Sequence, residues 1–296
     1  MSSPTTTTAA PSKKNAAEHL TLGHSPDSDD AFMFYALAEG KLDQQGFEFE
    51  HILQDIQTLN ERARKAELDI SAISIHNYAY VLDEYALLHS GASMGDNYGP
   101  RLVGKQALDR DELLEARIAV PGKWTSAYLA LQLYLDTPGD ELELIFLPFD
   151  EIFDALNDNE ADIGLIIHEG QLTFQDEGFV LTEDLGEWWY GTTDGLPLPL
   201  GGNVVKKSLG KKKIATLSKL LTESIQYALD HRESALEHAM RYSGKLTVEE
   251  ADKFVSMYVN ELTVDYGERG EEGVREFLTQ AHDMGLIPEP VNLEFV

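Results

Sequence analysis

Three consecutive residues, Thr125, Ser126 and Ala127, are candidates for binding an anion. They follow an expected strand and a Pro-Gly turn, and they open an expected helix. Hydroxyl groups at such a position can cap the helix, or they can bind an anion together with the first free N–H groups. Ordinary capping is the interpretation that the sequence favours. Ser74 ends another expected strand, and its hydroxyl is expected either to face the same cleft or to bond the backbone.

His168 is the candidate for a general base. It follows the apolar run at residues 162–167 and precedes Glu169 and Gly170. A histidine at the carboxyl end of a parallel strand points toward the edge where ligands bind. Its ordinary pKa of about 6.5 suits proton transfer near neutral pH. A core histidine with both ring nitrogens hydrogen-bonded is an equally consistent interpretation.

Asp27, Asp29 and Asp30 lie between the first expected strand and the first expected helix. Three carboxylates at one turn could hold Mg²⁺ or Ca²⁺. The favoured interpretation is that they are helix-capping acids, which the positive end of the helix dipole favours. We therefore expect no metal site in this protein.

Composition excludes several classes of function. The chain has 296 residues with 52 acidic and 23 basic side chains, which gives a net charge of −29. Such a charge repels nucleic-acid phosphates and anionic membranes, so we expect neither as a partner. The chain has no cysteine, which excludes thiol catalysis, thiolate metal sites and disulfides. The sequence contains no GxGxxG, GxxxxGK[ST] or GxSxG motif, so nucleotide-binding and serine-hydrolase functions lack support.

The elements that must position these residues alternate between strands and helices. The expected strands cover residues 19–23, 47–53, 68–74, 100–104, 117–120, 143–147 and 162–167. The expected helices cover residues 31–39, 56–66, 76–85, 126–135, 149–156, 211–241, 248–259 and 273–284. This alternation predicts an α/β fold with mixed, mainly parallel sheets. The loops after the strand carboxyl ends then gather at one edge, where ligands usually bind.

Two segments with proline and glycine, residues 100–104 and 195–202, are the expected connections between two lobes. Lobe one would then be discontinuous, with residues 19–104 and 197–296, and lobe two would contain residues 105–196. Residues 1–18 are rich in Thr, Ala, Pro and Ser, and we expect them to form a disordered tail. Because this segment has no apolar run typical of a secretory signal, we expect a cytoplasmic protein.

Six segments occur in a distinctive order along the chain. They are SPxxxDxFxFYAL (residues 25–37), AxS (72–74), VPGxxTSAY (120–128), GLIIHEGQLTF (164–174), GLPLPLG (195–201) and YVNxLTVDYGExG (258–270). Together they resemble the 1,4-dihydroxy-6-naphthoate synthase family of the futalosine pathway to menaquinone. The resemblance implies a two-lobed fold like that of type II periplasmic binding proteins. It also implies a lyase that cleaves cyclic dehypoxanthine futalosine to 1,4-dihydroxy-6-naphthoate without a metal or an organic cofactor.

The resemblance also implies roles for individual residues. It assigns the base to His168 and the substrate contacts to Ser126, Ala127 and the strand end formed by Ala72, Ile73 and Ser74. To these we add Thr125 and Asp29 as expected substrate-binding residues. The chain departs from the family at two positions. Asp29 stands where the family often has asparagine, and Ala72 where a lysine is sometimes found, so the expected cleft is less positive.

The sequence therefore predicts a carbon–carbon lyase that acts on a small carboxylated substrate. The carboxylate would lie against the start of the helix at residue 126, and His168 would remove a proton. Ring opening and a retro-aldol-like release of the sugar-derived fragment would follow, driven by aromatisation. The alternative is a non-catalytic solute-binding protein for a small aromatic or carboxylate ligand. The sequence leaves the oligomeric state open.

Overall fold

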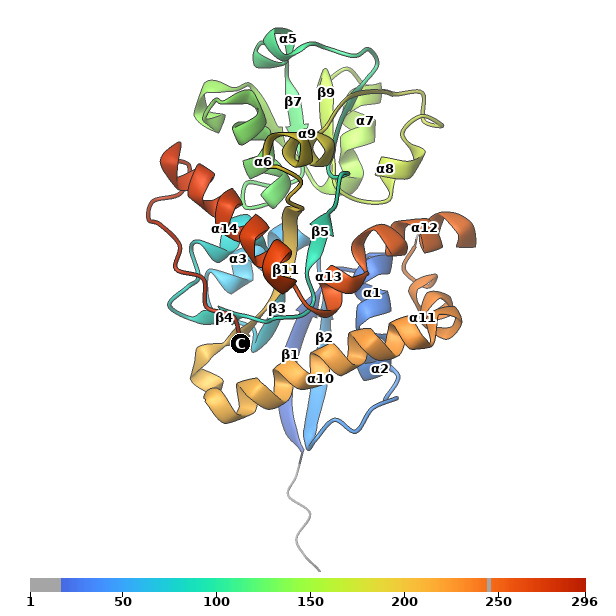
Figure 1. Cartoon of the computed structure of the whole chain (residues 1–296). Helices are drawn as coiled ribbons and strands as arrows, with labels where there is room; N and C mark the ends of the chain where they lie inside the picture. Colours follow the sequence, from blue (N-terminus) through green and yellow to red (C-terminus); the bar gives the residue numbers. More distant parts are fainter. Residues whose placement is uncertain (1–16, 244–245) are drawn as a thin grey trace, which may run out of the picture.

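The computed structural model describes residues 17–243 and 246–296. Within them the chain forms two β-sheets with helices packed around both (Figure 1). The predicted disordered tail, residues 1–18, falls outside the described residues except at its last two positions. Of these, Glu18 already belongs to the first strand.

The first sheet has the strand order β2-β1-β3-β11-β4, and β5 also pairs with β11. Strands β2, β1 and β3 run parallel, whereas β11 runs antiparallel to β3. This register places Gly201 opposite Ser74 and Asn203 opposite Ala72. The strands are β1 (Glu18–His24), β2 (Phe47–Leu53), β3 (Ile70–Ser74), β4 (Tyr85–Leu87), β5 (Ser93–Gly95) and β11 (Leu198–Lys206).

The second sheet has the strand order β10-β6-β9-β7-β8. Strands β9, β7 and β8 run parallel, and β6 and β10 add antiparallel pairings at one side. Both sheets are thus mixed, with parallel strands at their cores, and the predicted α/β class is confirmed. The strands are β6 (Arg101–Gly104), β7 (Ile118–Val120), β8 (Leu144–Phe146), β9 (Ile163–Ile166) and β10 (Val180–Asp184).

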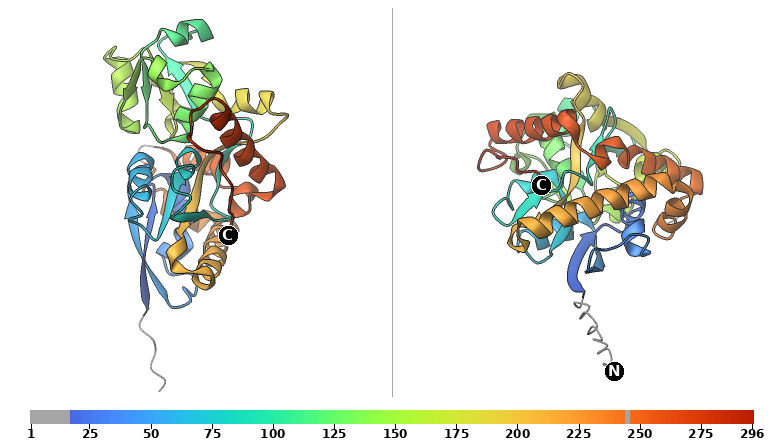
Figure 2. Two further views of the ribbon diagram at one scale, coloured as in Figure 1. Left: turned by 90° about the vertical axis from the view of Figure 1, so that its left-hand side faces the viewer. Right: turned by 60° about the horizontal axis from the view of Figure 1, so that its bottom comes forward.

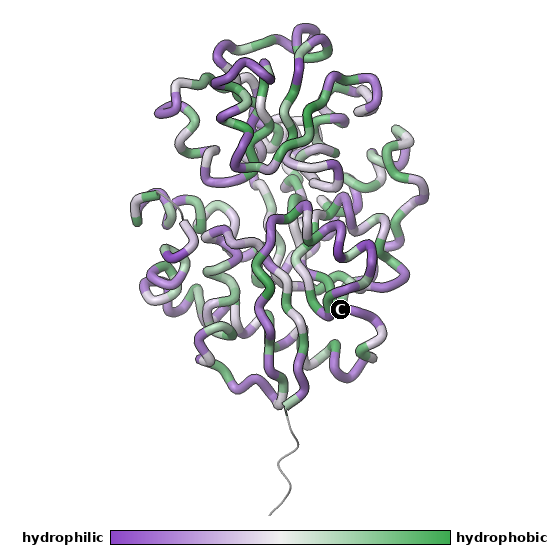
Figure 3. Tube along the Cα trace, turned by 180° about the vertical axis from the view of Figure 1, so that it is seen from behind, coloured by the Kyte–Doolittle hydropathy of each residue, from purple (hydrophilic) through white to green (hydrophobic). Residues whose placement is uncertain are grey.

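Helices pack around the two sheets (Figure 3), and the residues that they bury are mainly apolar. The longest, α10, crosses the lower half of Figure 1 and buries one stripe, which includes Leu217, Leu221 and Ile225. The helices are α1 (Ser28–Met33), α2 (Tyr35–Ala38), α3 (Ile56–Ala63), α4 (Ile75–Tyr78), α5 (Arg110–Leu114), α6 (Ser126–Leu135), α7 (Ile152–Asn157), α8 (Gly170–Thr173), α9 (Leu185–Thr192), α10 (Lys211–Asp230), α11 (Arg232–Ala239), α12 (Val248–Tyr258), α13 (Glu261–Val264) and α14 (Gly267–Asp283). None of the helices in the described part of the chain is long and apolar enough to cross a membrane.

One expectation about secondary structure is wrong. The helix expected at residues 76–85 ends at Tyr78, and Tyr85 begins strand β4. Tyr85 is buried and its hydroxyl donates to the Leu68 carbonyl, so tertiary packing overrides the local helical pattern. The segment expected as a connection between lobes, residues 195–202, includes the start of strand β11, in which Pro199 lies where the pairing with β5 shifts register. Proline is tolerated at such irregular positions.

The second sheet lies above the first in Figure 1, and β5 and β11 lead from one toward the other. Figure 2 shows the same two halves from the side. We propose that they correspond to the two predicted lobes, whose bounds at residues 104 and 196 stay a prediction. Strand β6, which that prediction assigned to lobe one, pairs within the second sheet.

Candidate active-site pocket

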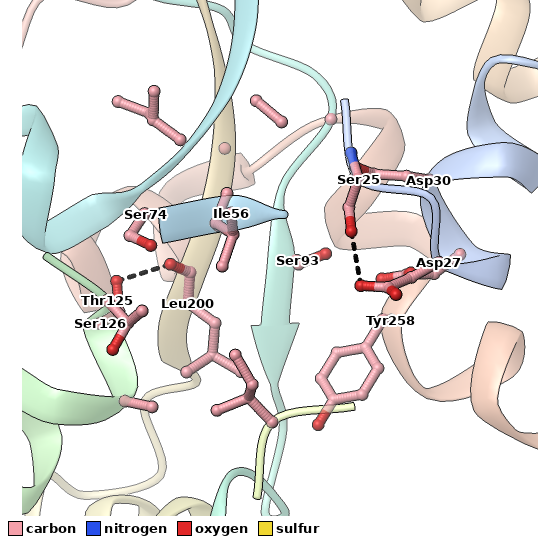
Figure 4. Close-up of a pocket in the computed structure, with 18 of the residues that line it drawn as sticks. Ser25, Asp27, Asp30, Ile56, Ser74, Ser93, Thr125, Ser126, Leu200 and Tyr258 are labelled. Atoms are coloured by element: carbon pink, nitrogen blue, oxygen red, sulfur yellow. Dashed lines mark hydrogen bonds between the residues drawn. The ribbon is translucent and has the colours of Figure 1, made fainter. Parts of the chain in front are cut away.

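A pocket lies where the carboxyl ends of strands from the two sheets face each other (Figure 4). It brings together all seven residues predicted to bind substrate, although their contacts with a substrate stay a prediction. The predicted base, His168, does not line it, whereas its neighbour Ile167 does. The lining residues are Ser25, Asp27, Asp29, Asp30, Ile56, Ala72, Ile73, Ser74, Gly91, Ser93, Pro100, Thr125, Ser126, Ala127, Ile167, Leu200, Gly201, Gly202, Asn203, Phe254 and Tyr258.

The start of helix α6 forms one side of the pocket, and its two hydroxyl groups already have partners. Thr125 Oγ1 accepts from the Tyr128 N–H at 3.2 Å and donates to the Gly122 carbonyl at 2.9 Å. The capping interpretation of Thr125 is therefore confirmed. Ser126 Oγ accepts from the His76 N–H at 3.1 Å and donates to the Leu200 carbonyl at 2.6 Å. What this side offers a ligand is the backbone N–H groups of the first turn, which have no acceptor within the helix.

Ser74 is held beside the helix start by a buried asparagine. The Ser74 N–H donates to Asn60 Oδ1 at 2.9 Å, and Asn60 Nδ2 donates to Ser74 Oγ at 2.9 Å. Because Asn60 supplies the donor to Ser74 Oγ, the hydroxyl proton of Ser74 remains to donate to a ligand. No sequence pattern indicated Asn60, because its partner, Ser74, lies 14 residues away on another element.

Three carboxyl groups, Asp27, Asp29 and Asp30, form the opposite side, which we name the acidic wall (Figure 4). Ser25 holds two of them, since its N–H donates to Asp30 Oδ2 and its hydroxyl donates to Asp27 Oδ2, both at 2.6 Å. Asp27 precedes α1, but its side chain makes no capping hydrogen bond, so the capping interpretation fails for this residue. Among the residues that the structure describes, no cluster of His, Asp and Glu could hold a metal ion.

Burial and mutual repulsion determine the protonation of the acidic wall. Burial raises the pKa of Asp27 and of Asp29 well above the usual range, and repulsion from Glu169 adds to both. Asp29 is further raised by Asp30. Burial also raises the pKa of Asp30, although the hydrogen bond from the Ser25 N–H partly lowers it. Carboxyl groups of this kind are partly neutral near pH 7 and can then donate hydrogen bonds.

His168 has both ring nitrogens hydrogen-bonded within its own half of the molecule. The Gly170 N–H donates to Nδ1 at 3.0 Å, which leaves the proton on Nε2, and Nε2 donates to the Phe149 carbonyl at 3.2 Å. Burial lowers the pKa of His168, and the neighbouring charge of Glu169 partly opposes that effect. In this conformation the ring is neutral and turned away from the pocket, as in the core-histidine interpretation.

The segment that follows His168 is tied to the other half of the molecule. The Ser28 hydroxyl on α1 donates to Glu169 Oε1 at 3.0 Å. The Tyr258 hydroxyl on α12 donates to Gln171 Oε1 at 2.7 Å. These contacts join residues 141 and 87 positions apart. They show that the position of the candidate base depends on how the two halves meet, which the sequence did not indicate.

Two mixed β-sheets surrounded by helices, with a pocket between them, define the class of this protein, the periplasmic-binding-protein-like fold. The alkanesulfonate-binding protein of Xanthomonas axonopodis pv. citri superimposes with a TM-score of 0.69 at 14% identity, covering 93% of this chain and 97% of that one. At this low identity the likeness shows the fold alone. The predicted fold class is confirmed.

The chain belongs to the menaquinone biosynthesis family, whose model matches residues 20–283. It is similar to the 1,4-dihydroxy-6-naphthoate synthase of Streptomyces coelicolor, at 36% identity over 92% of this chain and 96% of the relative. The enzyme of that name from Thermus thermophilus is 37% identical over 92% of this chain and 98% of the relative. A crystal structure of an Archaeoglobus fulgidus protein has a TM-score of 0.86 at 41% identity, covering 91% and 98% of the two chains. The predicted family is confirmed, and the chain is an enzyme of menaquinone biosynthesis.

Proposed function

We propose that this chain catalyses the reaction implied by the family resemblance, the cleavage of cyclic dehypoxanthine futalosine to 1,4-dihydroxy-6-naphthoate. The observation that carries the proposal is the 36% and 37% identity, each over 92% of the chain, with two enzymes named for that product. The solute-binding alternative is supported only by likeness of fold, at 14% identity for the alkanesulfonate-binding protein. A biosynthetic role also fits a cytoplasmic location, which we propose with it.

The two sides of the pocket orient a carboxylated substrate. The N–H groups of Ser126 and Ala127 point out of the positive end of α6, and the Ser74 hydroxyl can donate beside them. The acidic wall lies on the opposite side and repels a carboxylate whenever it is ionised. The ring carboxylate therefore binds at α6, and the uncharged part of the substrate is directed toward α1.

His168 is the base in this proposal, and it needs a change of conformation to act. Ile167 reaches the pocket, so the ring is one residue from a substrate-facing position. Rotation would break the hydrogen bonds to Gly170 and Phe149, and the freed Nδ1 could then accept a substrate proton. Proton removal opens the ring, and retro-aldol-like release of the sugar-derived fragment leads to the aromatic product. The proposed reaction uses no metal or organic cofactor, as the resemblance implies.

Incubation with cyclic dehypoxanthine futalosine, with detection of 1,4-dihydroxy-6-naphthoate by mass spectrometry, tests the proposal. The wild-type protein should form the product, and His168→Asn should lower kcat by about 100-fold or more, as expected for loss of a positioned base. His231→Asn, at an exposed position, is the matched control and should keep wild-type turnover. Tight binding without product would favour the solute-binding alternative. Near-normal turnover by His168→Asn would remove that residue from the mechanism.

A further inference from the structure

Asn203 lines the pocket and carries a buried side-chain acceptor that has no hydrogen-bond partner among the described residues. Its side chain is buried, with 1% of its surface exposed. The amide nitrogen donates to the Gly91 carbonyl at 3.2 Å, whereas Oδ1 has no hydrogen-bond partner in the described part of the chain. The opposite orientation of the amide would place two acceptors face to face, so the Gly91 carbonyl fixes which atom is left unpaired. Buried acceptors without a partner are unfavourable, so a ligand that donates here gains affinity.

The sheet register places Asn203 further from the end of strand β3 than the proposed carboxylate position beside Ser74. Asn203 lies opposite Ala72, and Gly201 lies opposite Ser74. Two residues along a strand span about 7 Å, so Asn203 lies roughly that far beyond the level of Ser74 and the start of α6. The methyl side chain of Ala72 leaves the floor open between the two levels. A ligand anchored by its carboxylate at α6 therefore extends over Ala72 to reach Asn203.

The chemistry of this inner region suits hydroxyl groups. Asn203 Oδ1 can only accept, and the acidic wall faces the same cavity with carboxyl groups that accept or, when protonated, donate. A second carboxylate or a phosphate would be repelled by the wall. Hydroxyl groups both donate and accept, and they carry no charge. In the substrate proposed above, hydroxyl groups of this kind belong to the sugar-derived part that the reaction releases.

We propose that Asn203 Oδ1, with the acidic wall beside it, forms a subsite that binds a hydroxyl group of the sugar-derived part of the substrate. This inference rests on the proposed function, because it assumes that substrate. Asn203 is then a specificity-determining residue that distinguishes the intact substrate from a naphthoate that lacks the sugar-derived part. Its contribution should appear in binding of the substrate and be absent in binding of a simple naphthoate.

The test uses calorimetry to compare the proteins with and without Asn203→Ala for three kinds of ligand. Both proteins also carry His168→Asn, so that the substrate is consumed only slowly. The ligands are cyclic dehypoxanthine futalosine, analogues that each lack one hydroxyl of its sugar-derived part, and 2-naphthoate. Asn203→Ala should weaken substrate binding by about 3- to 10-fold, the range for one neutral hydrogen bond. It should leave 2-naphthoate binding unchanged. One deoxy analogue should bind both proteins equally, because the partner of Asn203 is already missing.

Asn77→Ala is the matched control variant. Asn77 is also fully buried, its amide nitrogen donates to the Asn60 carbonyl at 3.1 Å, and its Oδ1 is likewise unpaired among the described residues. It does not line the pocket. Asn77→Ala should therefore keep the ratio of substrate affinity to 2-naphthoate affinity. An equal fall of that ratio in both variants would show general loosening and overturn the proposal.

Three further outcomes distinguish a failure of the subsite from a failure of the proposed function. If Asn203→Ala does not fold, the deoxy analogues can still be titrated into the protein that keeps Asn203. The subsite is refuted if every analogue then binds as tightly as the substrate. If the wild-type protein forms no naphthoate from the substrate, the proposed function fails first. If it does form naphthoate but Asn203→Ala binds substrate and 2-naphthoate with unchanged affinities, the subsite alone is refuted.

Discussion

The acidic wall should make binding of a carboxylated ligand depend on pH, and Asp29 is the residue to change. Burial, together with repulsion from Asp30 and Glu169, raises the pKa of Asp29 to about 8. The group is therefore mostly neutral at pH 6.5 and mostly ionised at pH 9. Since the ionised form repels a ligand carboxylate, affinity should fall as pH rises through this window. The same coupling means that a bound carboxylate raises the pKa of Asp29 further.

The size of the effect follows from the geometry of the pocket. The acidic wall follows β1, and the start of α6 is bonded to Leu200 on β11, two strands along in the order β1-β3-β11, which corresponds to two strand spacings or roughly 10 Å. Two unit charges at that separation repel by about 1.7 kcal/mol at an effective dielectric constant of about 20. This energy corresponds to roughly a 15-fold change in affinity on ionisation of one carboxyl group of the wall.

The assay is calorimetric titration with 2-naphthoate between about pH 6 and pH 9 at constant ionic strength. This probe carries one carboxylate, which stays ionised throughout. Wild-type affinity should fall by at least about 10-fold across the range, and the fall should be smaller in Asp29→Asn, with the remainder due to Asp27 and Asp30. Asp111→Asn, exposed on α5, makes the same change in net charge and should keep the wild-type profile. Superimposable profiles for wild type and Asp29→Asn, or affinity that rises with pH, would refute the reasoning.

Two predictions concern stability. Ser126→Ala removes the hydroxyl that bonds the His76 N–H and the Leu200 carbonyl. It should lower the free energy of unfolding, measured in urea, by about 1–3 kcal/mol. A loss of ligand affinity at unchanged stability would mean that this hydroxyl binds the ligand instead. Burial, with a smaller contribution from His51, lowers the pKa of His24 to about 4. Because the unfolded chain takes up this proton first, at a pKa of about 6.5, the folded protein should lose roughly 3 kcal/mol at this residue as pH falls from about 6.5 to 4. His24→Asn should lose correspondingly less over that window, and an equal loss would contradict the assignment.

Local patterns correctly predicted the elements that depend on contacts between residues close together in the sequence. Helix α6 has the bounds expected from the sequence, Ser126–Leu135, because Thr125 caps it three residues before its partner, Tyr128. Strand β2, Phe47–Leu53, was likewise expected from alternating apolar and polar residues. Where long-range packing decides the structure, the same patterns were misleading. The helix expected at residues 76–85 ends at Tyr78, and Tyr85 instead begins strand β4, where its hydroxyl donates to the Leu68 carbonyl.

The sequence alone indicated the seven predicted substrate-binding residues that line the pocket, because strand ends in an α/β fold meet at one edge and the family motifs mark them. Only the tertiary structure decided what each group can do there. The Ser126 hydroxyl is bound by Leu200, which lies 74 residues away, and the His168 ring is held by Phe149, which lies 19 residues away. The Gly91 carbonyl, 112 residues distant, accepts a hydrogen bond from the Asn203 amide nitrogen, and Oδ1 is left unpaired among the described residues. Side-chain periodicity repeats over a few residues and encodes helices and strands, whereas hydrogen-bond partners across the fold exist only once the sheets have packed.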